Sequence, residues 1–200
     1  MTELLLATTN PGKQAEFRRL LAGLGWPVLD PGQLGLALDI VEPHRSYARN
    51  AADKAAAYCR ASGRPTLADD SGIEVAALKW GPGTRTARFG GARVTDKAGY
   101  LLERMRGVAD RRARMVCWLA LAVPDATRGE PHIELFSGVM SGTVAGAKRG
   151  SGGFGYDPVF ELPSGMTAAE LPDAEKDRLS HRGQAVTAAT PRLRGLLEEG

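Results

Sequence analysis

The sequence has few of the residues that mark disulfide-rich, zinc-binding or membrane proteins. Among its 200 residues are two cysteines, Cys59 and Cys117, which lie far apart and lack Cys-x-x-Cys or zinc-site spacing. Both stand in apolar surroundings, which is typical of buried thiols in a reducing compartment. No apolar run approaches the ~20 residues of a membrane span, and the first residues lack the basic region of a signal peptide. We therefore expect a soluble, cytoplasmic protein with no membrane partner.

The chain also lacks a strong excess of one charge. Its net charge is +3, and it has no Lys/Arg tail. The most basic stretch, 104–114, contains five arginines but no interleaved aromatic residues. This pattern favours a solvated helix end over a nucleic-acid interface. A modest basic excess suits an anionic small molecule about as well as nucleic acid. With 43% hydrophobic residues, we expect one domain or two closely packed lobes.

Short apolar runs alternate with helical patterns along the chain. Residues 4–7 indicate a buried strand, and a first helix is expected to follow it. A second helix is predicted from Ala48 and is expected to end at Gly63, and a central strand is predicted over 115–123 with an antiparallel partner after it. A last helix is predicted over 185–197, broken or restarted at Thr190-Pro191. This order predicts an α/β fold with a mixed sheet.

A polar turn follows the first strand, with the sequence Thr8-Thr9-Asn10-Pro11-Gly12-Lys13. Asn10 is a good N-cap and Pro11 suits the first helical position, so the positive end of the helix dipole points at the turn. Lys13 is unfavourable for helix stability there, which indicates an anion-binding role. The alternative is an ordinary capped junction with a solvated lysine. The turn is not a Walker A loop, because Gly-x4-Gly-Lys-Ser/Thr is absent.

Two adjacent carboxylates, Asp69 and Asp70, follow an apolar run that indicates a strand, and Ser71-Gly72 is expected to form a turn. Ligands bind at strand ends in open α/β sheets, and a divalent cation or a cationic side chain relieves repulsion between paired acids. Glu42 precedes the second helix, where it could face a metal, and Lys54 on that helix could reach an anion. The alternatives are aspartates that cap the turn and a solvated lysine.

The C-terminal part holds two further candidate segments. Residues 146–158 form a Gly-rich stretch that carries Phe154 and Tyr156. An aromatic ring on such a loop is what a planar base stacks on, and the alternative is a structural loop with a core-plugging Phe. The second segment places three hydrogen-bond donors within seven residues: Lys176, His181 and Arg182. Alone, this second segment indicates a basic helix start.

Together these stretches resemble the inosine triphosphate pyrophosphatases, also called non-canonical purine nucleoside triphosphate or dITP/XTP pyrophosphatases. The resemblance runs from about Leu4 to Ala188 and rests on five motifs in the family's order and spacing. The motifs are Thr8–Lys13, Asn50-Ala51 with Lys54-Ala55, Ala68–Gly72, Gly152–Pro158 and Ser180–Arg182, and Glu42 stands where the family places a metal-binding Glu. There are two departures: Arg49 stands where the family often has Glu, and Arg85 where it usually has Tyr.

The resemblance implies hydrolysis of ITP, dITP or XTP to the monophosphate and pyrophosphate, which cleanses the nucleotide pool. It also implies Mg²⁺ as cofactor, purine nucleoside triphosphates as partners, a homodimer and no nucleic acid. The expected metal ligands are Glu42, Asp70 and Asp69, and Asp70 is also the expected catalytic base. The expected substrate-binding residues are Thr8, Thr9, Asn10, Pro11, Gly12, Lys13, Lys54, Ser71, Phe154, Gly155, Tyr156, Asp157, Lys176, His181 and Arg182.

We expect a single α/β domain over residues 1–200, with an elongated mixed sheet, flanking helices and two lobes around a central nucleotide-binding cleft. The donors of the 176–182 segment suit the C6 carbonyl of hypoxanthine or xanthine, whereas the amino group of adenine would leave them unpaired. Three alternatives stay open. They are a different nucleotide phosphatase, a non-catalytic nucleic-acid-binding module and a metabolite-sensing protein.

Overall fold

A computed structural model of the chain describes residues 3–125, 127 and 129–199. The chain divides into two compact units. The first unit comprises Met1–Asp70, Cys117–Gly138 and Arg182–Gly200, and the second unit comprises Ser71–Val116 and Val139–His181. Each unit therefore joins segments that are distant in the sequence, so its core depends on long-range contacts.

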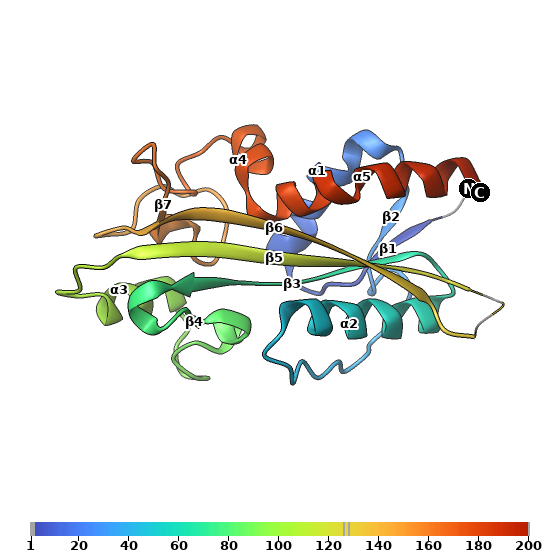
Figure 1. Cartoon of the computed structure of the whole chain (residues 1–200), viewed down its shortest axis with the longest axis horizontal. Coiled ribbons are helices and arrows are strands. Elements are labelled where there is room, and N and C mark those ends of the chain that lie inside the picture. Colours follow the sequence, from blue (N-terminus) through green and yellow to red (C-terminus); the bar gives the residue numbers. More distant parts are fainter. Residues whose placement is uncertain (1–2, 126, 128, 200) are drawn as a thin grey trace. The chain divides into compact units, whose positions relative to one another are not determined.

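The strands form a mixed sheet (Figure 1). They are β1 (Leu4–Leu6), β2 (Val28–Leu29), β3 (Thr66–Val75), β4 (Gly81–Pro82), β5 (Arg112–Val123), β6 (His132–Val144) and β7 (Phe160–Glu161). Their order is β2-β1-β3-β5-β6-β7, with β4 paired to β3 outside this path. β1 runs parallel to β2 and β3, whereas β4 is antiparallel to β3 and β7 is antiparallel to β6. The predicted α/β fold with a mixed sheet is confirmed.

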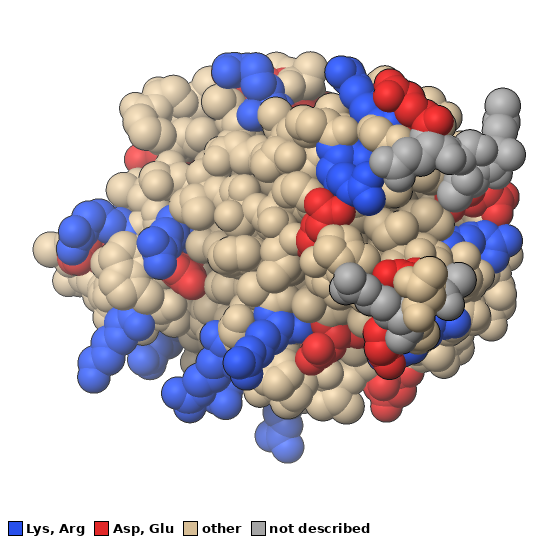
Figure 2. Space-filling view, turned by 45° about the vertical axis from the view of Figure 1, so that its right-hand side comes forward, with Lys and Arg blue, Asp and Glu red and all other residues tan. Residues whose placement is uncertain are grey.

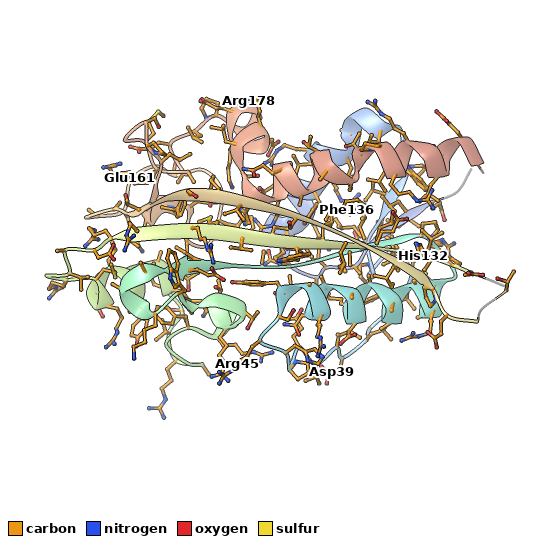
Figure 3. The ribbon with its side chains drawn as sticks, in the orientation of Figure 1. Asp39, Arg45, His132, Phe136, Glu161 and Arg178 are labelled. Carbon is orange, nitrogen blue, oxygen red and sulfur yellow. The ribbon has the colours of Figure 1, made fainter. Side chains whose placement is uncertain are left out.

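The helices of the first unit are α1 (Pro11–Leu21), α2 (Tyr47–Ser62) and α5 (His181–Glu199), with the short η1 (Ala22–Leu24). Figure 1 shows α1 and α5 on one side of this unit's strands and α2 on the other. Side chains alternate across a strand, so Leu6 packs in a cluster with Phe17 of α1, while Leu5 packs with Ala51 of α2. Phe136 of β6, labelled in Figure 3, packs partly buried against the Leu6 cluster. The two sides of β1 therefore hold two separate layers of core.

The helices of the second unit are α3 (Lys97–Arg104) and α4 (Asp173–Leu179), with the short η2 (Ala76–Leu78), η3 (Gly83–Arg88) and η4 (Asp157–Val159). Its core cluster joins Ile73 and Val75 of β3 to Leu101 of α3 and Phe160 of β7. Tyr156 of the Gly-rich segment belongs to this cluster, so that segment is attached to the core of the second unit.

The turn expected at Ser71-Gly72 is wrong, because β3 runs without a break through Asp69 and Asp70 to Val75. Gly72 is buried in this strand, and Ile73 and Val75 beyond it are core residues. Burial of this apolar continuation, together with the pairing of β3 and β4, outweighs the local turn preference of Ser-Gly. The two aspartates consequently lie in the middle of a strand and not at its end.

The break expected at Thr190-Pro191 is also wrong, because Pro191 lies inside α5. Ala189 and Leu193, on either side of the proline, are fully buried in the core of the first unit. The Thr190 hydroxyl donates to the carbonyl of Val186 at 2.9 Å, so a side chain serves a backbone acceptor near the proline. Tertiary packing therefore outweighs the helix-breaking preference of the proline.

Charged side chains on the surface are of mixed sign. Figure 2 shows Lys and Arg lying among Asp and Glu on the face in view. Part of the 104–114 stretch has partners within the second unit: Arg111 donates to the carbonyl of Ala145 at 2.6 Å, and Arg114 pairs with Glu74 at 2.7 Å. In the part of the chain that the structure describes, no helix is long and apolar enough to cross a membrane.

Candidate active site

The polar turn before α1 has the predicted geometry. Asn10 caps the helix, since its side-chain oxygen accepts the N–H of Lys13 at 3.1 Å, and Pro11 occupies the first helical position. The hydroxyl oxygen of Thr8 accepts the N–H of Asn10 at 3.3 Å. No acidic side chain occupies the first turn of α1, so nothing there neutralises the positive end of the helix dipole. This turn is therefore suited to an anion.

Lys13 belongs to a network of four charged residues in the first unit. Its Nζ lies 3.0 Å from Oδ1 and 2.8 Å from Oδ2 of Asp69, whose side chain is 1% exposed. Nε of Arg182 lies 3.6 Å from Asp69 Oδ2, and Nη1 of Arg182 donates to Glu16 Oε2 at 3.1 Å. Burial alone would raise the pKa of Asp69, but the cations Lys13, Arg182 and Lys54 hold it well below its usual range. Asp69 is therefore a buried, ionised anchor for Lys13.

Asp70 faces a different set of residues. Successive side chains of a strand point to opposite faces, and Asp70 accepts a 2.8 Å hydrogen bond from Asn50 of α2. Lys54 of α2 donates to Glu42. Burial raises the pKa of Asp70 to about 6; the hydrogen bond from Asn50 opposes this shift, and the negative charge of Glu42 adds to it. Burial alone would lower the pKa of Lys54, but Asp69, Glu42 and Asp70 together raise it above its usual value.

A second group of predicted residues gathers in the second unit. Asp157 Oδ2 accepts the N–H of Phe154 and the Nζ of Lys176, each at 2.7 Å. The Lys176 Nζ also lies 5.4 Å from the centre of the Phe154 ring, within cation–π range. Lys176 and Asp157 are buried, so this ion pair is shielded from water. One carboxylate thus fixes both the predicted stacking ring and the predicted donor.

Gly153 is required by this arrangement. Its φ is +66°, a backbone conformation that other residues rarely adopt. A Cβ at this position would stand 2.1 Å from Asp157 Oδ2 and 2.8 Å from Lys176 Nζ. The close approach of the Gly-rich backbone to the ion pair is therefore possible only without a side chain.

A sequence model of the Ham1 family matches residues 4–192. The chain belongs to the Ham1 family. It is 46% identical over 191 residues to a protein from Thermus thermophilus named dITP/XTP pyrophosphatase, with 93% of this chain and 89% of that protein covered. It is also 46% identical over 200 residues to a protein of the same name from Ralstonia nicotianae, with 97% and 98% covered. These relatives confirm the resemblance drawn from the five motifs.

Solved structures confirm the Ham1 fold. The Staphylococcus aureus Ham1 protein matches with a TM-score of 0.83 and 33% identity, covering 98% of this chain and all of that one. A HAM1 protein from Coxiella burnetii matches with a TM-score of 0.80 and 37% identity, and both chains are covered in full. The mixed sheet with flanking helices is therefore the architecture of this family.

The structure of this Ham1 chain places the predicted residues in two groups. The first unit holds the residues predicted to bind phosphate and metal: Thr8, Thr9, Asn10, Pro11, Gly12, Lys13, Glu42, Lys54, Asp69 and Asp70. Arg182 also belongs to the first unit, although it was expected to contact the base. The second unit holds the others: Ser71, Phe154, Gly155, Tyr156, Asp157, Lys176 and His181.

Some predicted residues make contacts that bear on their roles. The Tyr156 hydroxyl donates to the carbonyl of Thr86 at 3.0 Å, and the side chain is buried in the second unit's core. Its hydroxyl therefore holds the Gly-rich loop against η3. His181, at the start of α5, is buried, whereas Ser71 is half-buried. At Gly155 a Cβ would meet nothing within 4 Å, although its φ is +65°.

Glu42 and Asp70 are carboxylates that could hold a divalent cation, although Glu42 also accepts a hydrogen bond from Lys54. The charge of Glu42 contributes to the raised pKa of Asp70, so the two acids are close enough to repel each other. Mg²⁺ takes oxygen ligands and is usually bound through one or two carboxylates plus substrate phosphates. Among residues 3–125, 127 and 129–199, no group of three or more His, Cys, Asp or Glu is placed to hold a metal. Asp69 is already engaged by Lys13 and lies near Arg182.

Two residues that contact the predicted site residues were not themselves predicted. The side-chain N–H of Asn50 donates to Asp70. The side-chain oxygen of Asn50 accepts the backbone N–H of His44 at 3.1 Å, so both ends of the Asn50 amide are held. Asn50 lies four residues before Lys54, so the two share one face of the helix, and this spacing could have identified Asn50 as a neighbour of the site. Glu16, buried in α1, lies at i+3 from Lys13 on one helix face, but its partner Arg182 is 166 residues away. No local pattern predicts that contact.

Proposed function

We propose that this Ham1 chain hydrolyses dITP, ITP and XTP between the α- and β-phosphates, giving the monophosphate and pyrophosphate. The observation that carries the proposal is Asp70, a buried carboxylate whose pKa is raised to about 6 and which is held by Asn50. Support also comes from relatives named dITP/XTP pyrophosphatase that cover nearly the whole chain.

The first unit carries the groups that a triphosphate needs. Lys13, Lys54 and the N-terminus of α1 supply positive charge to phosphoryl oxygens. Glu42 and Asp70 would hold Mg²⁺, which when bound neutralises phosphate charge and lowers the pKa of water. Phosphoryl transfer depends mainly on positioning and charge stabilisation, so no covalent nucleophile is invoked.

Asp70 acts as the base in this proposal. A water oxygen bonds to the α-phosphorus, the bond from that phosphorus to the bridging oxygen breaks, and pyrophosphate leaves. The proton that the water loses goes to an oxygen of Asp70. A base works best when its pKa lies near the operating pH, and a value of about 6 leaves Asp70 mostly ionised at pH 7.

The second unit selects the base of the nucleotide. Phe154 supplies a ring on which a purine can stack, and Lys176 and His181 can donate to a C6 carbonyl. Adenine carries an amino group at C6, which cannot accept a hydrogen bond from these donors as a carbonyl oxygen can. Asp157 fixes Phe154 and Lys176 together, so stacking and donation depend on the same carboxylate.

A nucleotide panel tests the proposal. We expect dITP, ITP and XTP to release pyrophosphate in the presence of Mg²⁺, dATP to react at least about 100-fold more slowly, and chelation of divalent ions to stop turnover. Phosphate products are separated by ion chromatography. Release of orthophosphate in place of pyrophosphate would show a nucleotide phosphatase, and binding without turnover would show a sensor protein.

We further propose that the chain forms a homodimer in the cytoplasm. Two free, buried cysteines support a reducing compartment. Three large hydrophobic side chains of the second unit are exposed and could contribute to an association surface: Trp80, Val139 and Met166. Light scattering should give twice the chain mass of 21.2 kDa at micromolar concentration, and a monomer there would contradict the dimer. Cell fractionation followed by the pyrophosphate assay checks the location.

A further inference from the structure

The Gly-rich segment, residues 146–158, is anchored within the second unit by one of its own side chains. The guanidinium of Arg149 donates to Glu161 Oε2 at 2.7 Å and to the carbonyl of Gly165 at 2.6 Å. Its Nε also lies 3.3 Å from Glu170 Oε2. Glu161 of β7 is labelled in Figure 3. A single arginine thus ties the Gly-rich segment to three points further along the chain.

The backbone of Arg149 is held as well. Its N–H donates to the carbonyl of Pro158 at 2.9 Å, at the far end of the Gly-rich segment. Its carbonyl accepts the hydroxyl of Thr167 at 2.9 Å, and Thr167 is fully buried, so water does not compete for this bond. Glycine loses more conformational freedom on ordering than any other residue. A segment this rich in glycine therefore depends on such anchors to keep one conformation.

The backbone next to this arginine lies directly against residues 169–170. A Cβ at Gly150 would stand 2.4 Å from the carbonyl carbon of Ala169 and 2.7 Å from the nitrogen of Glu170. The N–H of Gly152 donates to the carbonyl of Ala169 at 3.0 Å. Backbone atoms cannot rotate away as the end of a side chain can, so the contact fixes how the two segments lie against each other.

This contact leads to the residues proposed to bind the base. The N–H of Ala169 donates to the carbonyl of Asp157 at 3.2 Å, and Pro158, which receives the arginine's N–H, is the next residue. The Asp157 carboxylate in turn holds the N–H of Phe154 and the Nζ of Lys176. Asp157 is therefore supported on both sides by backbone that the arginine keeps in place.

We infer that Arg149 is a positioning residue for base recognition, acting through Asp157. The inference rests on the proposed role of Phe154 and Lys176 in binding the base. An arginine suits this task because its planar group presents several N–H donors in fixed directions and can meet separate acceptors at once. A lysine presents one point charge on a flexible stem and cannot hold the same set.

A purely structural role for Arg149 has a different signature. If the arginine only stabilised the fold, its loss would lower the melting temperature and leave the binding properties of the folded protein unchanged. A positioning residue changes the geometry in which the purine is met, and a displacement of about 1 Å can cost about 100-fold. Phosphate binding depends on groups of the first unit in the proposed function, so it should change in neither case.

The test uses Arg149→Met and a matched control. Arg112→Met removes an arginine of the same unit that also meets a carboxylate through two N–H groups, at 2.9 and 2.8 Å. Its partner, Asp110, lies only two residues away, so this pair joins no distant segments. Thr167→Val removes the hydroxyl that holds the Arg149 carbonyl but keeps the branched shape. Thermal melts set a temperature at which every variant is folded.

Binding is measured by calorimetry with IMP, AMP and inorganic tripolyphosphate in metal-free buffer. For Arg149→Met we expect the IMP Kd to rise about tenfold and the preference for IMP over AMP to fall at least about fivefold. The tripolyphosphate Kd should stay within about twofold of wild type, as should all three constants of Arg112→Met. For Thr167→Val we expect a rise of about threefold in the IMP Kd, since one anchor is lost and the others remain.

The double variant tests whether Arg149 and Thr167 act on one contact. Combining the two substitutions should raise the IMP Kd about tenfold and not about thirtyfold, because residues that share a contact are not additive. The inference is overturned if Arg149→Met lowers the melting temperature but keeps the preference for IMP, if it weakens tripolyphosphate as much as IMP, or if the two substitutions multiply.

These titrations need no turnover, so they separate the inference from the proposed function. A wild-type chain that prefers IMP but releases no pyrophosphate from ITP would refute the proposed function and leave the role of Arg149 standing. A wild-type chain that binds IMP and AMP equally well would overturn the role of Arg149, whatever its activity.

Discussion

Asp70→Asn is expected to lower kcat for dITP by about 10³-fold while the chain remains folded. Asparagine has the shape of aspartate and can still accept the hydrogen bond from Asn50, but it cannot take the proton of the attacking water. Pyrophosphate release is measured at saturating dITP. Glu130→Gln is the matched control, since it also removes one carboxylate of the first unit but from a side chain that is 71% exposed. Activity of Asp70→Asn within tenfold of wild type would exclude Asp70 as the base.

The same substitution should make the metal-free protein more stable at pH 7. The folded-state pKa of Asp70 is raised from 3.8 to about 6, so the folded state holds this proton more tightly than the unfolded state. The contribution of Asp70 to wild-type stability therefore falls as pH rises through this window, and its full penalty of ~1–3 kcal/mol is present at pH 7. Asparagine carries no such penalty. Urea unfolding should show the variant's advantage at pH 7 and its disappearance near pH 4.

Gly153→Ala is expected to have the second largest effect. The new Cβ would lie 2.1 Å from Asp157 Oδ2, so the Asp157–Lys176 pair must open or the loop must shift. Opening a buried pair costs about 3–5 kcal/mol, and Phe154 loses its backbone anchor as well. We expect lower stability together with a fall of at least about tenfold in the dITP/dATP ratio of kcat/KM.

Gly107→Ala separates this steric effect from backbone strain. Gly107 of the second unit has a φ of +71°, close to that of Gly153, but a Cβ there would meet nothing within 4 Å. The Gly107→Ala variant should lose only ~1–2 kcal/mol of stability, the cost of placing a residue with a side chain in the left-handed conformation. Its preference among nucleotide bases should not change. If the two variants lose equal stability by urea unfolding, the contact between Gly153 and the ion pair is unimportant.

The sequence predicted local structure well, that is, single helices, strands and helix caps. The Asn10 cap with Pro11 after it, the helix over α2 and the strand over β5 all follow from periodicity and turn preference. The wrong turn at Ser71-Gly72 and the wrong break at Pro191 have a common cause, since burial in a core outweighed a local preference in each case.

The charge network could not be predicted, because it depends on contacts between remote segments. Arg182 meets Glu16 across 166 residues, and Lys13 meets Asp69 across 56. Composition and spacing identified Lys13, Asp69 and Arg182 as candidates but gave no partners. The three residues that sequence motifs assigned to phosphate, metal and base therefore lie in one ion network of the first unit.

Consecutive aspartates on opposite faces of β3 make this segment intolerant of a change in length. Inserting or deleting one residue between Leu67, which pairs with β1, and Asp69 would rotate the acids, bringing a carboxylate toward α2 where α1 and α5 need one. The proton acceptor and the lysine anchor would then trade places. Natural variants of the chain should therefore keep a fixed number of residues between Leu67, which pairs with β1, and the two aspartates.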